Sequence, residues 1–446
     1  MGFLNHWLLL LLLLLPIAGA VTLLFVRGPG PARWTSIGVS LGALLVSLAL
    51  LIPLSRTPAG FGLGLDGLSF PFIVLATVLC AAACVASFAV DGHVGFHCAL
   101  ILLLESATIG FFLSFNQWMG WACFASMILP AFLMARNWGG ERRRLAARQF
   151  AVLMLIGAGC LLLVLTRHNR SVGTVALLLI GFGIRLPLPP FHGWLRDVVA
   201  KCSPPASLLL TSLFSLTGGY GLVCAFPSLG QSGPVLSVIG AFALLYGAGL
   251  LLGQTDPAKA IVSLAVASAG FVMLGLANGT WAGANAAVFT ILAQGLIVGL
   301  MSVLLSLLAA RLKPLPLQDA TGLGNAAPMF ATFLGLAWFS QLTVPGLVGP
   351  VFTIIAVLAK DDPGHRAYAI ALPAILGTVL IAAGSIRAVR SLLGGSSGPV
   401  SLQDLNGREL TYLVPLAVLT VLLGAFSKAL CFAFTSPAIE AIFRSP

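Results

Sequence analysis

Residues 181–197 read GFGIRLPLPPFHGWLRD. The stretch begins as apolar as a transmembrane helix, and then Arg185 is followed by Pro187, Pro189 and Pro190. Proline has no backbone N–H and its ring clashes with the preceding turn, so a helix is expected to break here. In lipid, the carbonyl groups that such a break frees need partners from neighbouring helices or from water. We therefore expect this segment to line a polar interior.

The composition around this stretch is that of an all-α polytopic membrane protein. Of 446 residues, 59% are hydrophobic and 8% are charged, and the mean hydropathy is +1.07. A bilayer core of about 30 Å needs roughly 20 apolar residues per helix, and about fourteen runs of this kind are present. These runs are 7–26, 34–54, 68–90, 94–114, 117–136, 149–167, 173–190, 204–226, 235–254, 258–278, 284–311, 329–359, 366–390 and 410–432.

The gaps between these runs are short. The longest, 391–409, is too short for a soluble domain that would hold a nucleotide or a redox cofactor. Of the eight cysteines, all but Cys202 lie in apolar runs and none forms a CxxC pair. We therefore expect no bound cofactor, no metal site and no catalytic centre in this chain.

The net charge of +11 comes from 23 Lys and Arg residues scattered over short loops, which does not fit a nucleic-acid surface. If successive helices cross the membrane in alternate directions, 15 of these residues lie on one side of the membrane, 7 lie on the other side, and Arg185 lies inside a run. Cytoplasmic loops carry the excess of Lys and Arg. This asymmetry predicts that both termini lie outside the cytoplasm.

A second apolar run, 329–359, is interrupted by Pro345, Gly346, Gly349 and Pro350. If runs 4 to 8 and 9 to 13 form two five-helix units, both breaks fall in the fourth helix of a unit. An odd number of helices inverts the second unit, and inverted repeats with broken helices are typical of transporters. The alternative is two unrelated proline kinks.

The repeat hypothesis divides the chain into four parts. The predicted parts are three N-terminal helices in 1–93, the first repeat in 94–226, the second repeat in 227–391, and the fourteenth helix with the tail in 392–446.

Five stretches of the sequence then match one family in order and spacing. RLPLPPFHGWLRD, followed by SPPAS, resembles the KxPxxPFHxWLPDAHxxAPTxxS signature of the antiporter-like, proton-translocating membrane subunits of respiratory complex I. The other stretches are LDGLSFPFIVLATVL, MILPAFLMARNWGGE, GQTDPAKAIVSLAVASAGFVMLG and VFTILAQGLIVGL. The family is shared with multisubunit sodium/proton antiporters and membrane-bound hydrogenases, and the DGLS and WGGE forms are most similar to the subunit M type.

The resemblance implies a fourteen-helix subunit in which a line of ionisable side chains crosses the middle of the bilayer and passes protons. The family typically has a Glu on helix 5, a Lys on helix 7, a Lys or His on helix 8, His residues on helices 10 and 11, and a Glu or Lys on helix 12. Matched motif by motif, this chain has replaced all of them. The residues at these positions are Ala125, Arg185, Leu216, Ser268, Gln294 and Thr353.

Arg185 does not restore the relay, because a guanidinium stays protonated even when it is buried. It is expected to anchor an anion, a carboxylate or water. Glu105, in the run 94–114, is the one carboxylate deep in an apolar run. An ionisable group in a membrane is a functional hypothesis by default. Glu105 is interpreted either as the partner of Arg185 or a residual proton carrier, or as a neutral acid that faces a partner subunit.

By resemblance, His192 and Asp197 lie at the start of the family's proton path, although a structural role is the competing interpretation because the family's PDAH is here Arg196-Asp197-Val198-Val199.

The family predicts a proton-translocating type of subunit in an NADH:quinone oxidoreductase-like complex of a bacterial plasma membrane, with other membrane subunits and lipid as partners. The replaced residues favour a copy that no longer pumps. Two alternatives stay open, which are a scaffold that anchors a peripheral module for inorganic-carbon uptake or hydrogenase chemistry, and an anion or small-solute path based on Arg185.

Overall fold

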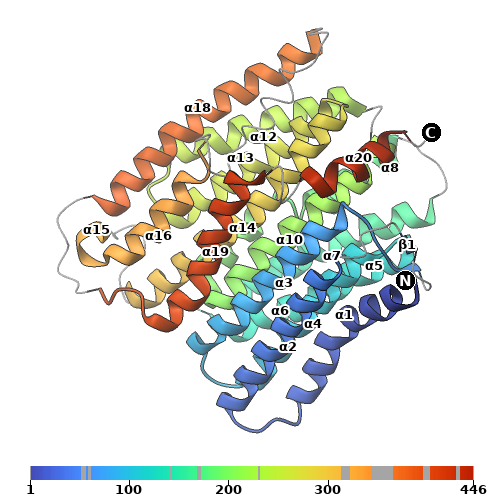
Figure 1. Cartoon of the computed structure of the whole chain (residues 1–446). Coiled ribbons are helices and arrows are strands. Elements are labelled where there is room, and N and C mark those ends of the chain that lie inside the picture. The colour runs from blue at the N-terminus through green and yellow to red at the C-terminus, as the bar shows by residue number, and fades with distance from the viewer. Residues whose placement is uncertain are drawn as a thin grey trace.

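Nearly all of the described chain is helical, and the axes of the helices are roughly aligned in one bundle (Figure 1). The computed structural model describes residues 2–51, 57–58, 62–139, 143–167, 172–229, 232–312, 322–342, 365–394, 402–427 and 432–444. The first half contains α1 (Gly2–Leu23), α2 (Pro29–Ala49), β1 (Thr57–Pro58), β2 (Gly64–Leu65), α3 (Ser69–Ala86), the 3-10 turn η2 (Ser87–Ala89), α4 (Val94–Leu113), α5 (Gln117–Ser126), α6 (Ile128–Asn137), α7 (Arg143–Thr166), α8 (Val172–Gly183), α9 (Gly193–Lys201) and α10 (Pro204–Cys224). The second half contains α11 (Phe226–Leu229), α12 (Gly233–Gly253), α13 (Pro257–Ala277), α14 (Trp281–Leu312), α15 (Leu323–Ala326), α16 (Pro328–Phe339), α18 (His365–Leu393), α19 (Gly407–Ala425) and α20 (Ala433–Arg444).

The all-α membrane architecture is confirmed. Within the described residues, eleven helices are long and apolar enough to cross a bilayer, and three shorter apolar helices accompany them. Each predicted run holds an apolar helix wherever the structure describes it. The strands β1 and β2 pair antiparallel, and the other described residues between helices form short connections. The number of fourteen spans, the inverted repeats and the four-part division stay predictions.

The predicted break in the run 173–190 is present. Helix α8 ends at Gly183 and α9 begins at Gly193, so the prolines lie in the nine intervening residues. A second break was not predicted: the run 117–136 divides at Met127 into α5 and α6. Pro130 accounts for it, because its missing N–H leaves the carbonyl of Ser126 without the bond that would continue the helix. The prolines and glycines of the second predicted break, at 345–350, lie outside the described residues.

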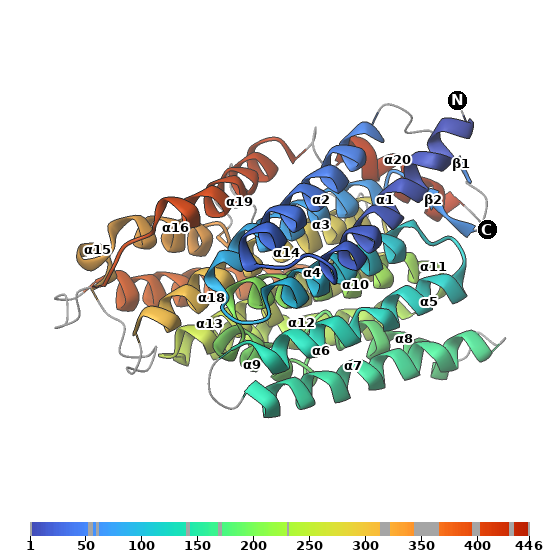
Figure 2. The ribbon, with the colours of Figure 1, turned by 90° about the horizontal axis from the view of Figure 1, so that it is seen from below.

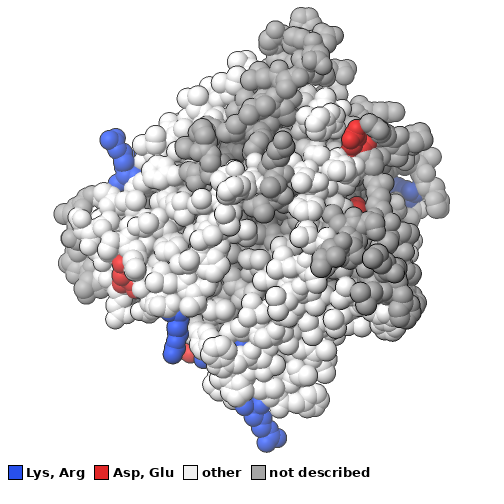
Figure 3. All heavy atoms as spheres, in the orientation of Figure 1, with Lys and Arg blue, Asp and Glu red and all other residues white. Residues whose placement is uncertain are grey.

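The surface and the termini fit a membrane protein. In Figure 3, Lys, Arg, Asp and Glu atoms lie near the edges of the visible face, and the broad area between them carries none among the described residues. Both termini lie at the same end of the bundle (Figure 1). The opposite end, which holds the start of α2 and the short helices α9 and α15 (Figures 1 and 2), is called the basic end below because Arg33, Arg143, Lys201 and Arg311 lie there.

The centre of the bundle is formed by α10, α13 and α14, which are almost completely buried (Figure 2). Close approach of α10 and α14 depends on glycine. A Cβ atom on Gly295 would lie 2.7 Å from the side chain of Leu216, and one on Gly299 would lie 2.0 Å from the Oγ atom of Ser212. Small residues let helix backbones approach closely. Close packing matters in a membrane, because lipid is as apolar as the helices and no hydrophobic force drives the helices together.

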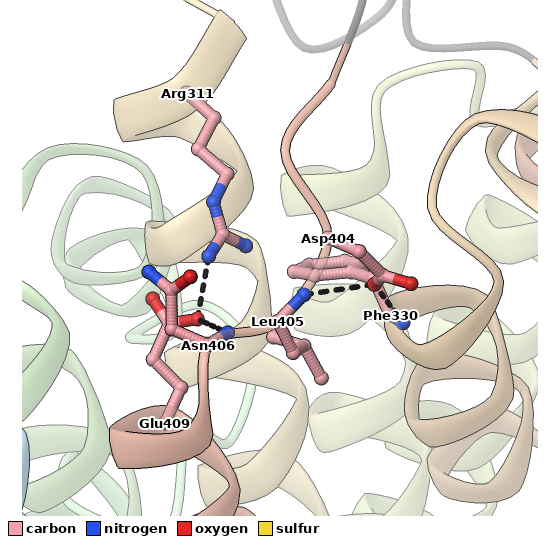
Figure 4. Close-up of polar contacts among 6 residues, drawn as sticks. All are labelled: Arg311, Phe330, Asp404, Leu405, Asn406 and Glu409. Carbon is pink, nitrogen blue, oxygen red and sulfur yellow. Dashed lines mark hydrogen bonds and ion pairs between the residues drawn. The ribbon is translucent and has the colours of Figure 1, made fainter.

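Polar contacts at the basic end join α14, α16 and α19 through the segment 402–409 (Figure 4). Arg311 pairs with Glu409 at 2.5 Å, and Glu409 also accepts a hydrogen bond from the backbone of Asn406. The Asp404 carboxylate accepts bonds of 2.9 Å from the backbone N–H groups of Met329 and Phe330, at the start of α16. These contacts fix the first half of the interrupted run 329–359.

Asp404 gives a test of this junction. Burial alone would raise the pKa of Asp404, but the N–H groups of Met329, Phe330 and Leu405 donate to its carboxylate and hold the pKa below its usual value. Asp404→Ala should therefore lower the unfolding midpoint at neutral pH by the equivalent of about 1 kcal/mol, the usual loss for an acceptor at a helix N-terminus.

The pH dependence has a definite sign. A lowered pKa means that the carboxylate stabilises the fold above about pH 4 and that this contribution disappears as the pH falls through the folded-state pKa. The difference in unfolding midpoint between the unmodified protein and Asp404→Ala should shrink in acid. Gln403→Ala, at the exposed neighbouring position, should have the same midpoint as the unmodified protein at every pH. A difference that grows toward low pH would contradict the assignment.

Candidate functional site

The Arg185 side chain is enclosed at the break between α8 and α9 and is 1% exposed. Its Nη1 atom donates to the Thr217 hydroxyl at 3.1 Å and to the Met127 sulfur at 3.2 Å. Its Nη2 atom donates to the Phe124 carbonyl, and its guanidinium carbon lies 3.2 Å from the centre of the Phe124 ring and 4.7 Å from that of Phe214. All of these partners are neutral, so the guanidinium is a fixed cation held by dipoles and aromatic faces.

Local sequence explains how these partners meet. Met127 stands where α5 gives way to α6, which brings the last carbonyls of α5 within reach of the guanidinium. Phe214 and Thr217 are three residues apart and share a face of α10. On the same helix, a Cβ atom on Gly218 would lie 2.7 Å from the backbone nitrogen of Leu186, so glycine lets the broken segment lie directly against α10.

The predicted pair of Arg185 and Glu105 is wrong. Ser40 on α2 donates to Glu105 at 3.0 Å, and Glu105 forms no ion pair in the described part of the chain. Glu105 is 0% exposed on α4, so it does not face a partner subunit either. Each side chain points to its own neighbours: Arg185 toward α5 and α10, and Glu105 toward α2. Sequence places both residues in apolar runs but does not give the direction in which each one points.

His192 and Asp197 do lie together. Both line a cavity of about 810 Å³ beside α9, along with the cations Arg148, Arg196 and Lys259. Asp197 pairs with Lys201 at 2.5 Å, and the His192 ring meets the edge of Tyr246 at 5.7 Å. Arg185 does not line this cavity. The break therefore separates a surface cavity that is rich in cations from the enclosed guanidinium.

Three of the remaining relay positions, Leu216, Ser268 and Gln294, lie in the centre of the bundle and carry neutral side chains. Leu216 packs against Gly295 of α14, and Gln294 donates to the carbonyl of Ala265 on α13 at 3.2 Å. Ser268 bonds to the Gln341 side chain at 3.4 Å. Ala125 is half-buried on α5, next to the Phe124 carbonyl that holds Arg185. Thr353 lies outside the described residues.

Comparisons with known proteins agree with this architecture. Residues 165–361 match the family model described as NADH:quinone oxidoreductase/Mrp antiporter, transmembrane. The chain is 29% identical over 404 residues to an NAD(P)H-quinone oxidoreductase chain 4 of Picosynechococcus, which covers 82% of this chain and 76% of that one. It is 24% identical over 482 residues to NADH-quinone oxidoreductase subunit M of Rhodobacter capsulatus, which covers 94% and 93%.

Solved structures give the same fold. A chain of respiratory complex I from Thermus thermophilus matches with a TM-score of 0.81 and 23% identity, over 98% of this chain and 99% of that one. A chain of the Mrp complex from Dietzia matches with a TM-score of 0.84 and 15% identity, over 99% and 98%. The chain has the fold of antiporter-like membrane subunits, and its residues 165–361 match their family. The family resemblance of the five motifs is confirmed.

In this antiporter-like subunit, buried charge is scarce and unexpectedly placed. Among the described residues, the carboxylate, imidazole and cationic side chains that are buried are His97, Glu105 and Arg185. His97 was missed in the sequence, although it lies four residues into the apolar run 94–114, where a polar residue is unusual. No three His, Cys, Asp or Glu side chains in the described ranges converge as metal ligands. That the chain binds no metal and no cofactor stays a prediction.

The contacts of Arg185 can be tested by two double-mutant cycles. Arg185→Met combined with Thr217→Val should show a coupling of about 1 kcal/mol, because the two side chains share a hydrogen bond. Arg185→Met combined with Glu105→Gln should be additive within about 0.5 kcal/mol, because the two residues share no partner. Unfolding midpoints of the purified variants supply both values, and strong coupling in the second cycle would restore the predicted pair.

Proposed function

We propose that this chain is a membrane subunit of an NADH:quinone oxidoreductase-like or antiporter-like assembly and that its own proton relay is interrupted. The assembly follows from the relatives: one bears the name NADH-quinone oxidoreductase subunit M, and the fold recurs in chains of complex I and an Mrp complex. The interruption follows from the residues of this chain. The chain contributes no catalytic centre of its own in this account.

The observation that carries the interruption is that no described side chain of the buried line can both gain and lose a proton. A proton crossing about 30 Å of hydrocarbon needs groups that gain and lose protons, or continuous water between them. The line from the break in α8 through α10 and α14 to α13 presents Arg185, Leu216, Gln294 and Ser268. Arginine stays charged, leucine excludes water, and amide and hydroxyl groups hold no exchangeable charge. Leu216 packed against Gly295 fills the space where the relay would continue.

Location and partners complete the proposal. The 15 to 7 asymmetry of Lys and Arg puts the basic end in the cytoplasm of a bacterial cell and both termini outside the plasma membrane. Both termini lie at one end of the bundle, as this orientation requires. The partners are other membrane subunits and lipid. A scaffold role for a peripheral module is compatible with the same interruption.

One observation favours a second function, the anion path. Arg148, Arg196 and Lys259 line the cavity beside the broken helix and would raise the local concentration of anions. Arg185 lies deeper along the same break. Its guanidinium lies against the rings of Phe124 and Phe214, which close off the direct approach, so we rank this path second.

Flux measurements decide between these functions. The purified subunit in liposomes should carry no proton flux above that of empty liposomes under an imposed potential. Ala125→Glu together with Arg185→Lys and Leu216→Lys should be the minimum set that restores any, with Arg185→Lys alone as the inactive control. Proton flux through the unmodified protein would contradict the proposal, and chloride flux that is lost in Arg185→Met would support the anion path instead.

A further inference from the structure

The cavity of about 810 Å³ beside α9 has walls from four helices, α7, α9, α12 and α13. Figure 2 shows α9 beside the start of α7, at the basic end. Helices α7 and α13 line the cavity with their first turns, and α12 lines it with its last turn. The position of a lining residue along these three long helices therefore gives its depth below the basic end.

The part of the cavity nearest the basic end, its mouth, carries cations from three different helices. These are Arg148 of α7, Arg196 of α9 and Lys259 of α13. None of the three forms an ion pair within the described part of the chain. Among the described lining residues the one carboxylate is that of Asp197, which pairs with Lys201 at 2.5 Å. The mouth therefore has an excess of positive charge.

Other polar groups near the mouth leave this excess in place. Asp256, at the start of α13, accepts a hydrogen bond of 3.0 Å from the backbone N–H of Ala258 and does not line the cavity. Gln149 and Gln254 do line it, and their neutral amides can donate hydrogen bonds. Guanidinium, ammonium and amide donors together form a set that binds a phosphate group.

Below the mouth, the lining is apolar on all three long helices. The apolar residues that lie one or two turns farther from the basic end are Val152, Leu153, Leu250, Val262 and Val266. Val266 follows Lys259 by two turns of α13, so it lies about 10 Å deeper, and it is fully buried. The Trp194 ring adds to this apolar wall, because its N–H group donates to the carbonyl of Ile184.

Apolar surface continues from the cavity along α12. Phe242 and Tyr246 precede Leu250 by two turns and one turn, so the three residues share a face of the helix. Phe242 is 58% exposed and Tyr246 is 36% exposed, and their rings stack with centres 5.6 Å apart. The Tyr246 ring also meets that of His192, a lining residue, at 5.7 Å. The aromatic pair thus extends the apolar wall toward the middle of the bilayer.

This distribution of charge distinguishes between possible occupants of the cavity. A small anion from water would meet the cations but leave the apolar part below them wet. An apolar side chain of a partner protein would fill the lower part but leave three cations without a counter-charge. A phospholipid meets both requirements, because its phosphate lies at the level of the helix ends and its acyl chains extend into the hydrocarbon core. Basic pockets between membrane helices are typical sites for anionic headgroups.

We propose that this cavity binds one anionic phospholipid of the leaflet at the basic end. Its phosphate lies among Arg148, Arg196 and Lys259, and one acyl chain follows the apolar lining toward Tyr246 and Phe242. The bound lipid joins α7, α9 and α13 across the break that follows α8. The site goes beyond the proposed function, in which lipid is only the surroundings of the subunit, and it does not depend on whether the relay is interrupted.

Native mass spectrometry of the full-length protein tests this site. The protein is released from nanodiscs that contain equal amounts of phosphatidylglycerol and phosphatidylcholine with the same acyl chains. One phosphatidylglycerol per chain should be retained in preference to phosphatidylcholine. Arg148→Gln, Arg196→Gln and Lys259→Gln should each lower this preference roughly fivefold, the factor that corresponds to about 1 kcal/mol per cation. The triple variant should show no preference.

Both parts of the site have a matched control on α7. Arg144 is exposed one turn before Arg148 and does not line the cavity, so Arg144→Gln should leave the preference unchanged. Val152→Asn places an amide in the apolar part and should lower the retention of both lipids. Leu155→Asn changes a residue that is equally exposed on the same helix but lies outside the cavity, and it should lower neither.

Three results would overturn the proposal. The triple variant could retain phosphatidylglycerol as strongly as the unmodified protein, or Arg144→Gln could weaken retention as much as the cavity variants, which is the behaviour of a diffuse attraction. Excess inorganic phosphate could also displace the lipid, which is the behaviour of a site for a free anion. None of these readouts involves proton flux, so failure of this site and failure of the interrupted relay are distinguishable.

Discussion

The Arg185 guanidinium is enclosed by a carbonyl, a hydroxyl, a thioether and two aromatic rings, and it forms no ion pair with any carboxylate of the described residues. A permanent charge in the middle of a bilayer has to be stabilised where it stands, because it has no neutral form to adopt. The break after α8, the end of α5 at Met127 and the close contact at Gly218 all serve this requirement. Much of the local architecture is thus set by one cation.

In the proposed function, the same charge is what interrupts the relay. A fixed cation repels protons that approach along the line and cannot pass them on. Two other positions of the line carry neutral side chains that pack and hydrogen-bond between helices, Leu216 against Gly295 of α14 and Gln294 to the carbonyl of Ala265 on α13. The helices α10 and α14 are in close contact at Gly295 and Gly299. The interior has become a packed core within an antiporter-like fold.

Sequence predicted the parts of this structure that depend on composition and on proline. Apolar runs gave the helices, three prolines gave the break near Arg185, and five motifs gave the family. The break at Met127 was missed because Pro130 lies within a run that looks continuous. The partner of Glu105 was predicted wrongly, because hydropathy gives the depth of a residue but not the direction in which it points around its helix. His97 was missed for a related reason, since its isolation from polar partners is visible only once α4 and Trp138 are packed together.

The central claim, that Arg185 is a fixed charge and not a proton carrier, can be measured through the pH dependence of stability. Unfolding midpoints of the unmodified protein, Arg185→Lys and Arg185→Met should be compared between about pH 7 and about pH 10, the range in which a lysine can lose its proton. A buried lysine with neutral partners binds fewer protons in the folded state than in the unfolded state, so Arg185→Lys should gain stability relative to Arg185→Met as the pH rises. If Arg185 is a fixed charge, the difference between the unmodified protein and Arg185→Met should stay constant over the same range. A difference that changes with pH as much as that of the lysine variant would contradict it.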